Sequence, residues 1–144
     1  MKSLFRKVED FVKRKFSKVV HVANGSHEAV RVTVKDNGEN QQETCAALER
    51  GEITQHRSTG WTNDPKITVY VHVEYKNGHV ESMNTRNNKS VIITDDGLVK
   101  AKYETWYQGN DSSVWRDQND NCYKPSCNNK GFFFSFLADN PLKL

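Results

Sequence analysis

Strict alternation between apolar and polar residues is the feature that most limits how this chain folds. In the segment AVRVTVKD, polar residues separate Val30, Val32 and Val34, and in ITVYVHVEY every second residue from Ile67 to Tyr75 is apolar or aromatic. Successive side chains of a β-strand point to opposite faces, so this period of two predicts strands with one buried face. Two such segments favour a fold built from β-sheets.

Short turn sequences separate further predicted strands along the chain. Asn-Gly or Asp-Gly pairs occur at 37–38, 77–78 and 96–97, and such pairs favour tight β-hairpin turns. Further strands are predicted at 17–23, 41–47, 50–57, 79–84, 89–94, 98–107 and 131–137. The last of these, GFFFSFL, is apolar on both faces and is expected at the centre of a sheet. The prediction is a mainly β chain: an antiparallel β-sandwich or barrel-like domain preceded by an N-terminal amphipathic α-helix.

The turn at 77–78 also predicts a pairing register. A two-residue loop places Glu74 directly opposite Glu81, which is an unfavourable contact between like charges. His72 and His79 then fall on the same face, so the four side chains form a candidate metal site. The alternative is an exposed face on which a neighbouring lysine and water relieve the repulsion. The sequence favours this alternative, and no metal is predicted.

The length of 144 residues is that of one domain. The predicted parts are a basic amphipathic helix at 1–17 and a single β-sandwich domain at 18–144, with a long polar loop at about 108–130. No apolar run approaches the roughly eighteen residues of a membrane span, and charges interrupt the segment where a secretion signal needs an apolar run. A cytoplasmic protein, peripheral to membranes at most, is therefore expected, with Cys122 and Cys127 reduced. The oligomeric state stays open.

The N-terminal segment combines an apolar stripe with a high positive charge. Residues 1–20 contain seven Lys or Arg and two acidic residues, a net charge of +5, whereas the other 124 residues carry 14 basic and 16 acidic side chains. On a helical projection the apolar side chains fall within about 140° of arc, as in an amphipathic helix. The candidate membrane- or partner-binding residues are Leu4, Phe5, Val8, Phe11, Val12 and Phe16, with the cations Arg6, Lys7, Lys13, Arg14, Lys15 and Lys18.

Two interpretations of this helix are open. Binding to an anionic membrane surface or an acidic protein is favoured by the cationic face, because each cation near an anionic leaflet contributes about 1 kcal/mol. Lys15 falls inside the apolar stripe, where a membrane lets its ammonium reach water. The alternative is that the helix serves as a structural lid on the sandwich. If the helix ends near Arg14, Lys15 lies outside it and does not distinguish the two interpretations. A helix over Leu4–Phe16 before a strand near His21–Ala23 resembles the plan of the actinoporin-type pore-forming proteins, in architecture alone.

The polar loop at about 108–130 is a second candidate site. Aromatic rings beside amide and carboxylate groups are typical of sites for carbohydrates or small polar ligands. Its candidate residues are Trp115, Tyr123, Asp117, Asn119 and Asn121. The sequence DQNDN matches the first half of a calcium-binding loop, but Cys122 stands at the glycine position and Asn128 at the position of the bidentate glutamate. The alternative is that the polar residues form turns while the rings hold the loop in place.

Catalytic signatures are absent from the sequence. It contains no G-x-S-x-G, no H-E-x-x-H and no phosphate-binding glycine loop, and the slightly acidic body does not indicate nucleic-acid binding. The predicted function is a non-enzymatic binding module whose cationic helix associates with an anionic membrane surface or an acidic protein partner, without a cofactor or metal. The alternatives are ligand binding through the polar loop and a helix that serves only as a lid.

Overall fold

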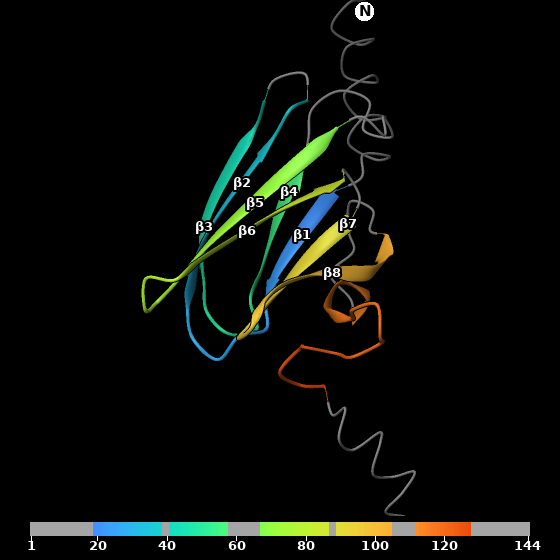
Figure 1. Cartoon of the computed structure of the whole chain (residues 1–144). Coiled ribbons are helices and arrows are strands. Elements are labelled where there is room, and N and C mark those ends of the chain that lie inside the picture. The colour runs from blue at the N-terminus through green and yellow to red at the C-terminus, as the bar shows by residue number, and fades with distance from the viewer. Residues whose placement is uncertain (1–18, 39–40, 58–66, 87–88, 105–111, 128–144) are drawn as a thin grey trace, which may run out of the picture.

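The computed structural model describes residues 19–38, 41–57, 67–86, 89–104 and 112–127, and these ranges form β-strands and one short 3-10 helix, η1. The strands are β1 (Val19–Asn24), β2 (Val30–Asp36), β3 (Glu43–Leu48), β4 (Ile53–Arg57), β5 (Thr68–Tyr75), β6 (Val80–Arg86), β7 (Lys89–Thr94) and β8 (Gly97–Glu104). Figure 1 shows them in two layers. The prediction of a mainly β chain is confirmed.

Each layer is a four-stranded sheet. One sheet has the order β4-β1-β7-β8 and the other has the order β3-β2-β5-β6. Neighbouring strands are antiparallel except β1 and β7, which run parallel with Val22 opposite Val91. The prediction of purely antiparallel pairing is therefore wrong at this pair. Only strands joined by a tight hairpin must be antiparallel, and β1 and β7 are separated by five other strands along the chain.

The apolar core lies between the two sheets. One sheet contributes Val20, Val22, Val91 and Ile93, and the facing sheet contributes Val30, Val32, Val34, Val69, Val71 and Val73. The predicted alternation in β2 and β5 is confirmed, since these valines are buried while Arg31, Lys35, Tyr70 and Glu74 between them are exposed. Burying one such side chain contributes roughly 1.5–3 kcal/mol, so this core holds the sheets together.

The predicted register of the β5–β6 hairpin is wrong by one residue. Glu74 pairs with Val80 and Val73 pairs with Glu81, so the two glutamates do not face each other. The loop has three residues, 76–78, closed by a hydrogen bond from the Tyr75 N–H to the His79 carbonyl (2.8 Å). A two-residue loop of the favoured type needs two left-handed residues, whereas in this loop Gly78 alone has a positive φ, of 91°. The metal site that depended on the other register is lost.

Residues 112–127 cover the outer face of the β1 sheet. The helix η1 (Ser112–Trp115) and the turn after it form a second apolar cluster on β1, composed of Ala23, Val114, Trp115 and Cys122 with Ile53, Tyr123 and Cys127 at its margin. Cys122 and Cys127 are joined by a disulfide, which corrects the expectation of reduced thiols. The pair lies in one tight turn, five residues apart, where two sulfurs meet readily.

Some predictions concern residues that the structure does not describe. They include the amphipathic helix at 1–17 with all of its candidate binding residues, the aromatic strand at 131–137, and the ends of the polar loop outside 112–127.

Candidate functional site

The polar loop does not present its tryptophan to a ligand. Trp115 is 1% exposed, and its ring packs in the apolar cluster on β1. Tyr123 is half-buried, and its hydroxyl donates a hydrogen bond of 2.9 Å to Asp117 Oδ2. A sugar needs an open ring face for stacking, so the predicted ligand-binding role of Trp115 is not supported by its position. The ring holds the loop to the sheet instead.

The side chain of Asp117 binds the backbone of its own turn, the segment DQNDN whose sequence matches the first half of a calcium-binding loop. Its Oδ1 accepts the backbone N–H groups of Asn119 (2.9 Å) and Asn121 (3.0 Å). Burial alone would raise the pKa of Asp117, but these bonds and the Tyr123 hydroxyl together hold it below the ordinary value of 3.8. Burial and the bond to Asp117 raise the pKa of Tyr123. Within the described ranges, no group of three or more His, Cys, Asp or Glu side chains is placed to hold a metal ion.

A buried histidine joins the two sheets at one edge. His56 of β4 lies with its Nε2 2.5 Å from Asp36 Oδ2 of β2, and its Nδ1 is 2.8 Å from Thr44 Oγ1 of β3. The side chains of His56 and Asp36 are fully buried. The order hydroxyl, imidazole and carboxylate resembles a catalytic triad, but a group with no access to solvent cannot meet a substrate. We define Thr44, His56 and Asp36 as the inter-sheet clamp and assign it a structural role.

The sequence carried one signal of this clamp. Asp36 continues the alternation of Val30, Val32 and Val34, so a carboxylate occupies a position whose side chain must face the core. A carboxylate in that place requires a partner, because an unpaired buried charge is very unfavourable. The partner itself was not predictable, since His56 comes from the other sheet.

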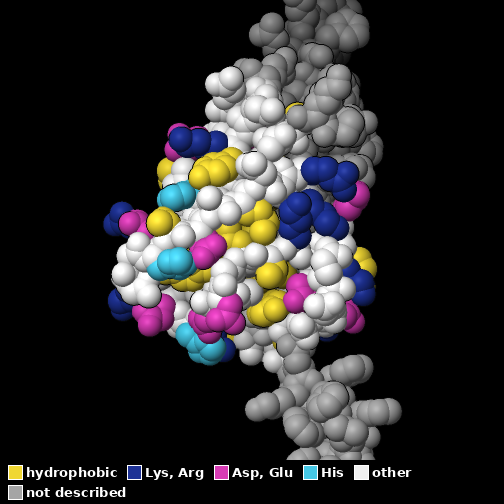
Figure 2. All heavy atoms as spheres, in the orientation of Figure 1, with side chains coloured by type: hydrophobic (Ala, Val, Ile, Leu, Met, Phe, Trp, Pro, Cys, Tyr) yellow, Lys and Arg dark blue, Asp and Glu magenta, His cyan; other side chains and the backbone are white. Residues whose placement is uncertain are grey.

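Basic side chains gather where β6 ends, β7 begins and β8 nears its end. We define the basic edge as Arg86, Lys89, Lys100 and Lys102. Figure 2 shows Lys and Arg side chains side by side in the region between β6 and β8. Lys89 Nζ donates to the Lys102 carbonyl (3.0 Å), and Lys102 Nζ is 3.6 Å from Asp120 Oδ1, which also lies 3.9 Å from Arg116. Asp120 is therefore shared by two cations. Glu104, opposite Lys89, adds a second carboxylate. The four cations of the basic edge, together with Arg116, still outnumber these two carboxylates.

An exposed aromatic ring adjoins the basic edge. Tyr103 is 45% exposed, which makes it one of the few large apolar side chains on the described surface, and Lys102 Nζ lies 5.3 Å from its ring centroid. Tyrosine has an apolar ring and a polar hydroxyl, a combination that is enriched where proteins meet the membrane–water interface. The region thus combines cations with an amphipathic ring.

The basic N-terminal segment joins the fold at this same end. Because β1 and β7 are parallel and Val22 lies opposite Val91, Val19 at the start of β1 lies near Lys89 at the start of β7. Residues 1–18 precede Val19 in the sequence and contain seven Lys or Arg. The point at which this segment connects to the described fold therefore lies close to the basic edge. No helix of the described ranges has the length and apolar character needed to cross a membrane.

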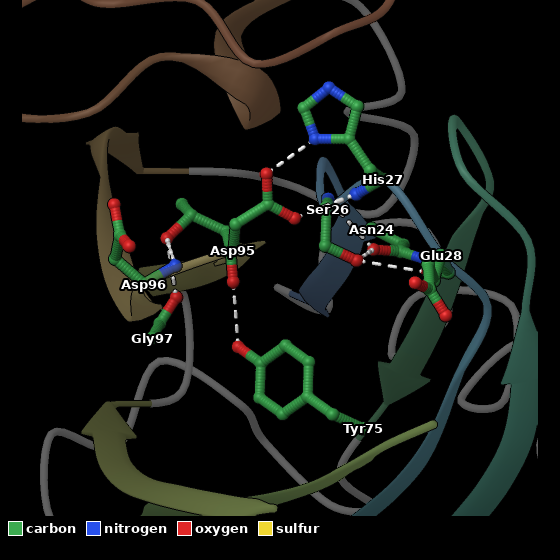
Figure 3. A network of polar contacts seen from close by, with 9 residues as sticks. Asn24, Ser26, His27, Glu28, Tyr75, Asp95, Asp96 and Gly97 are labelled. Carbon is green, nitrogen blue, oxygen red and sulfur yellow. Dashed lines mark hydrogen bonds and ion pairs between the residues drawn. The ribbon is translucent and has the colours of Figure 1, made fainter. Parts of the chain in front are cut away.

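The opposite end of the fold contains a polar hollow between three turns. Its volume is about 150 Å³, and its lining residues are Ser26, Glu28, Tyr75, Lys76, Asn77 and Asp95. Figure 3 shows the polar contacts around it, which connect the β1–β2 loop, the end of β5 and the β7–β8 turn. The described turns and strand ends here carry Glu28, Glu49, Glu52, Glu74, Glu81, Asp95 and Asp96 against Arg31, Arg50 and Lys76. This end is acidic, and the two ends of the molecule differ in charge.

Sequence reasoning missed the hollow because its residues come from three separate turns, and the Asn-Gly and Asp-Gly pairs in two of them predict turns but not a shared ligand site. The only local signal was the concentration of polar residues in the segments 24–28 and 94–97. Comparison with protein families, with curated proteins and with solved structures finds no match, so the geometry above is the basis for assigning a function.

Proposed function

We propose that the chain is a non-enzymatic β-sandwich module that binds reversibly to an anionic membrane surface through the basic edge together with the basic N-terminal segment. The observation that carries the proposal is the position of Val19 beside the basic edge. Residues 1–18, with seven Lys or Arg, connect to the domain at Val19, which supports a role for both groups of cations on one membrane surface. A surface that is positive at one end and acidic at the other favours a single orientation on a negative plane.

The expected strength follows from the number of charges. Each Lys or Arg near an anionic leaflet contributes about 1 kcal/mol, so the basic edge adds several kcal/mol to the contribution of the N-terminal segment. The exposed ring of Tyr103 adds an apolar contact suited to the headgroup region. Exposed charges are screened by salt within about 10 Å at 0.1 M ionic strength, so binding should weaken as salt is raised.

Cosedimentation of the full chain with vesicles tests the proposal. The chain should sediment with vesicles that contain phosphatidylserine, should remain in solution with neutral phosphatidylcholine vesicles, and should be released at high salt. The variant Arg86→Gln, Lys89→Gln, Lys100→Gln, Lys102→Gln should bind at least tenfold more weakly, since it removes four cations at about 1 kcal/mol each.

A matched control separates the basic edge from net charge. The variant Arg31→Gln, Arg50→Gln, Lys76→Gln, Lys124→Gln also removes four cations, but none of them lies at the end that carries the basic edge. It should retain most of the binding. Equal losses in both variants would contradict a defined binding edge, and no salt-sensitive binding in the parent chain would favour the alternative of an acidic protein partner.

A further inference from the structure

The hollow at the acidic end is a preformed space of molecular size. Its volume of about 150 Å³ equals that of a cavity known to bind benzene, which has six heavy atoms. Five of its six lining residues are polar or charged and the sixth is a tyrosine, so both carbon atoms and polar groups face the space. Such a lining suits a small ligand that has charged or polar groups to exchange hydrogen bonds with the walls.

The walls of the hollow are fixed by internal hydrogen bonds. The buried side chain of Asn24 donates from Nδ2 to the carbonyls of Glu28 and Leu48 (both 2.9 Å), and its Oδ1 accepts from the N–H and hydroxyl of Ser26. The Tyr75 hydroxyl donates to the Thr94 carbonyl at 2.7 Å. Figure 3 shows that these bonds hold the β1–β2 loop and the Tyr75 ring on facing sides. A site that is already formed loses little order when it binds a ligand.

Two ionisable groups of the hollow, Asp95 and Tyr75, have shifted pKa values. The backbone N–H of His27, together with its ring, holds the pKa of Asp95 below the ordinary value of 3.8, so this carboxylate is negative at neutral pH. Burial, with the nearby charges of Glu81, Asp95 and Asp96, raises the pKa of Tyr75 to about 12, so its hydroxyl stays a donor. The hollow thus presents a stable anion and a neutral ring.

Two opposite charges of the lining, on Glu28 and Lys76, do not pair with each other, whereas Asp95 accepts the His27 N–H (2.8 Å) and contacts the His27 ring. Within the described part of the chain, the Glu28 carboxylate and the Lys76 ammonium make neither an ion pair nor a side-chain hydrogen bond. Asn77 uses its Oδ1 to accept the His79 N–H at 2.9 Å, so its amide nitrogen is the group that can donate to a ligand. The lining therefore offers acceptors for a cation and donors for an anion within one small space.

We propose that this hollow binds a small zwitterion that carries an ammonium group and a carboxylate on the same carbon, the head group of a free α-amino acid. The Glu28 carboxylate takes the ammonium, Asp95 adds a second acceptor beside its bonds to His27, and Lys76 with the Asn77 amide takes the carboxylate. Charge-assisted hydrogen bonds of this kind are about twice as strong as neutral ones. The open mouth of the hollow lets a side chain of the ligand extend outward, so the head group, and not the side chain, determines recognition.

An NMR titration of the full chain tests this site with three probes: glycine, methylammonium and acetate. Glycine has both charged groups, and each of the other probes has one. Glycine should cause saturable shifts in the backbone amide signals of Ser26, Glu28, Tyr75, Asn77 and Asp95, with a dissociation constant of roughly millimolar size, as expected for a ligand of a few heavy atoms. Methylammonium and acetate should bind at least tenfold more weakly.

Two variants and two matched controls make the result specific. Glu28→Gln and Lys76→Gln should each weaken glycine binding at least fivefold. Glu49→Gln and Lys35→Gln change the net charge equally, but lie outside the lining, and should leave binding unchanged. Absence of saturable shifts at the lining residues, binding of glycine no tighter than that of its two halves, or equal losses in variants and controls would each overturn the proposal. Since the vesicle experiment concerns the other end of the molecule, failure here leaves it unaffected.

Discussion

Individual buried polar residues connect separate elements of this fold. The inter-sheet clamp places a carboxylate and an imidazole between two apolar layers, at the edge where β3 and β4 meet. Asp36 was recognisable in the sequence as a carboxylate on a core-facing position, but His56 was not recognisable as its partner, because the contact joins residues of different sheets. Likewise, the sequence identified Asp117 as polar but did not show that its carboxylate would bind the backbone of its own turn.

The clamp predicts a large loss of stability when one member is removed. Asp36→Ala leaves His56 buried without its acceptor, and breaking a buried pair in this way costs about 3–5 kcal/mol. The exposed pair of His27 and Asp95 is the control, since removal of an exposed partner, as in His27→Ala, costs about 1 kcal/mol or less. Urea unfolding measures both values. Similar losses in the two variants would show that the clamp contributes no more than a surface contact.

Asp117 predicts a dependence of stability on pH. Its pKa is lower in the folded chain than the ordinary 3.8, so its contribution is complete above that value and is lost as the pH falls through the lower, folded pKa. Asp117→Asn removes the ionised form, so the variant should be less stable than the parent chain near neutral pH. This difference should shrink in strong acid, where the parent is protonated as well. Urea unfolding of both proteins near neutral pH and in acid tests this, and a difference independent of pH would contradict it.

At the scale of elements, the alternation of residues predicted the strands well and their connections less well. β2 and β5 lie where their patterns placed them, with valines inward. The register of the β5–β6 hairpin was missed because an Asn-Gly pair serves a two-residue loop and also the last two positions of a three-residue loop. The loop was predicted at about 108–130, and within its described part, 112–127, the alternative of rings that hold the loop in place is confirmed by the burial of Trp115. The second apolar cluster itself was not predicted, because Val114, Trp115 and Cys122 are too sparse in the sequence.

The hairpin loop gives a test at the same scale. Gly78 has a φ of 91°, and no atom lies within 4 Å of the place that a Cβ would occupy, so a substitution there is penalised by backbone conformation alone. Gly78→Ala should destabilise the chain by about 1 kcal/mol. Gly78→Asn should cost less, because asparagine tolerates the left-handed conformation better than alanine. Thermal unfolding ranks the two, and the reverse order would mean that the loop adopts another turn type in solution.

For the whole molecule, the central feature is the difference in charge between its two ends. The net charge of +3 conceals it, because the basic N-terminal segment is offset by acidic turns elsewhere in the chain. The sequence showed where the positive excess lies along the chain, but the parallel pairing of β1 and β7 determines that this segment joins the fold beside the basic edge. The positive charge of the basic edge, together with the exposed ring of Tyr103, is the physical basis of the proposed membrane contact.

The most direct measurement is therefore the orientation of the chain on an anionic vesicle. NMR spectra of the full chain, recorded with vesicles that contain a paramagnetic lipid, report which amide signals broaden because they lie close to the surface. We expect broadening at Arg86, Lys89, Lys102 and Tyr103, and sharp signals at Ser26 and Asp95 at the opposite end. Broadening that is uniform, or that is strongest at Ser26 and Asp95, would contradict the proposed orientation.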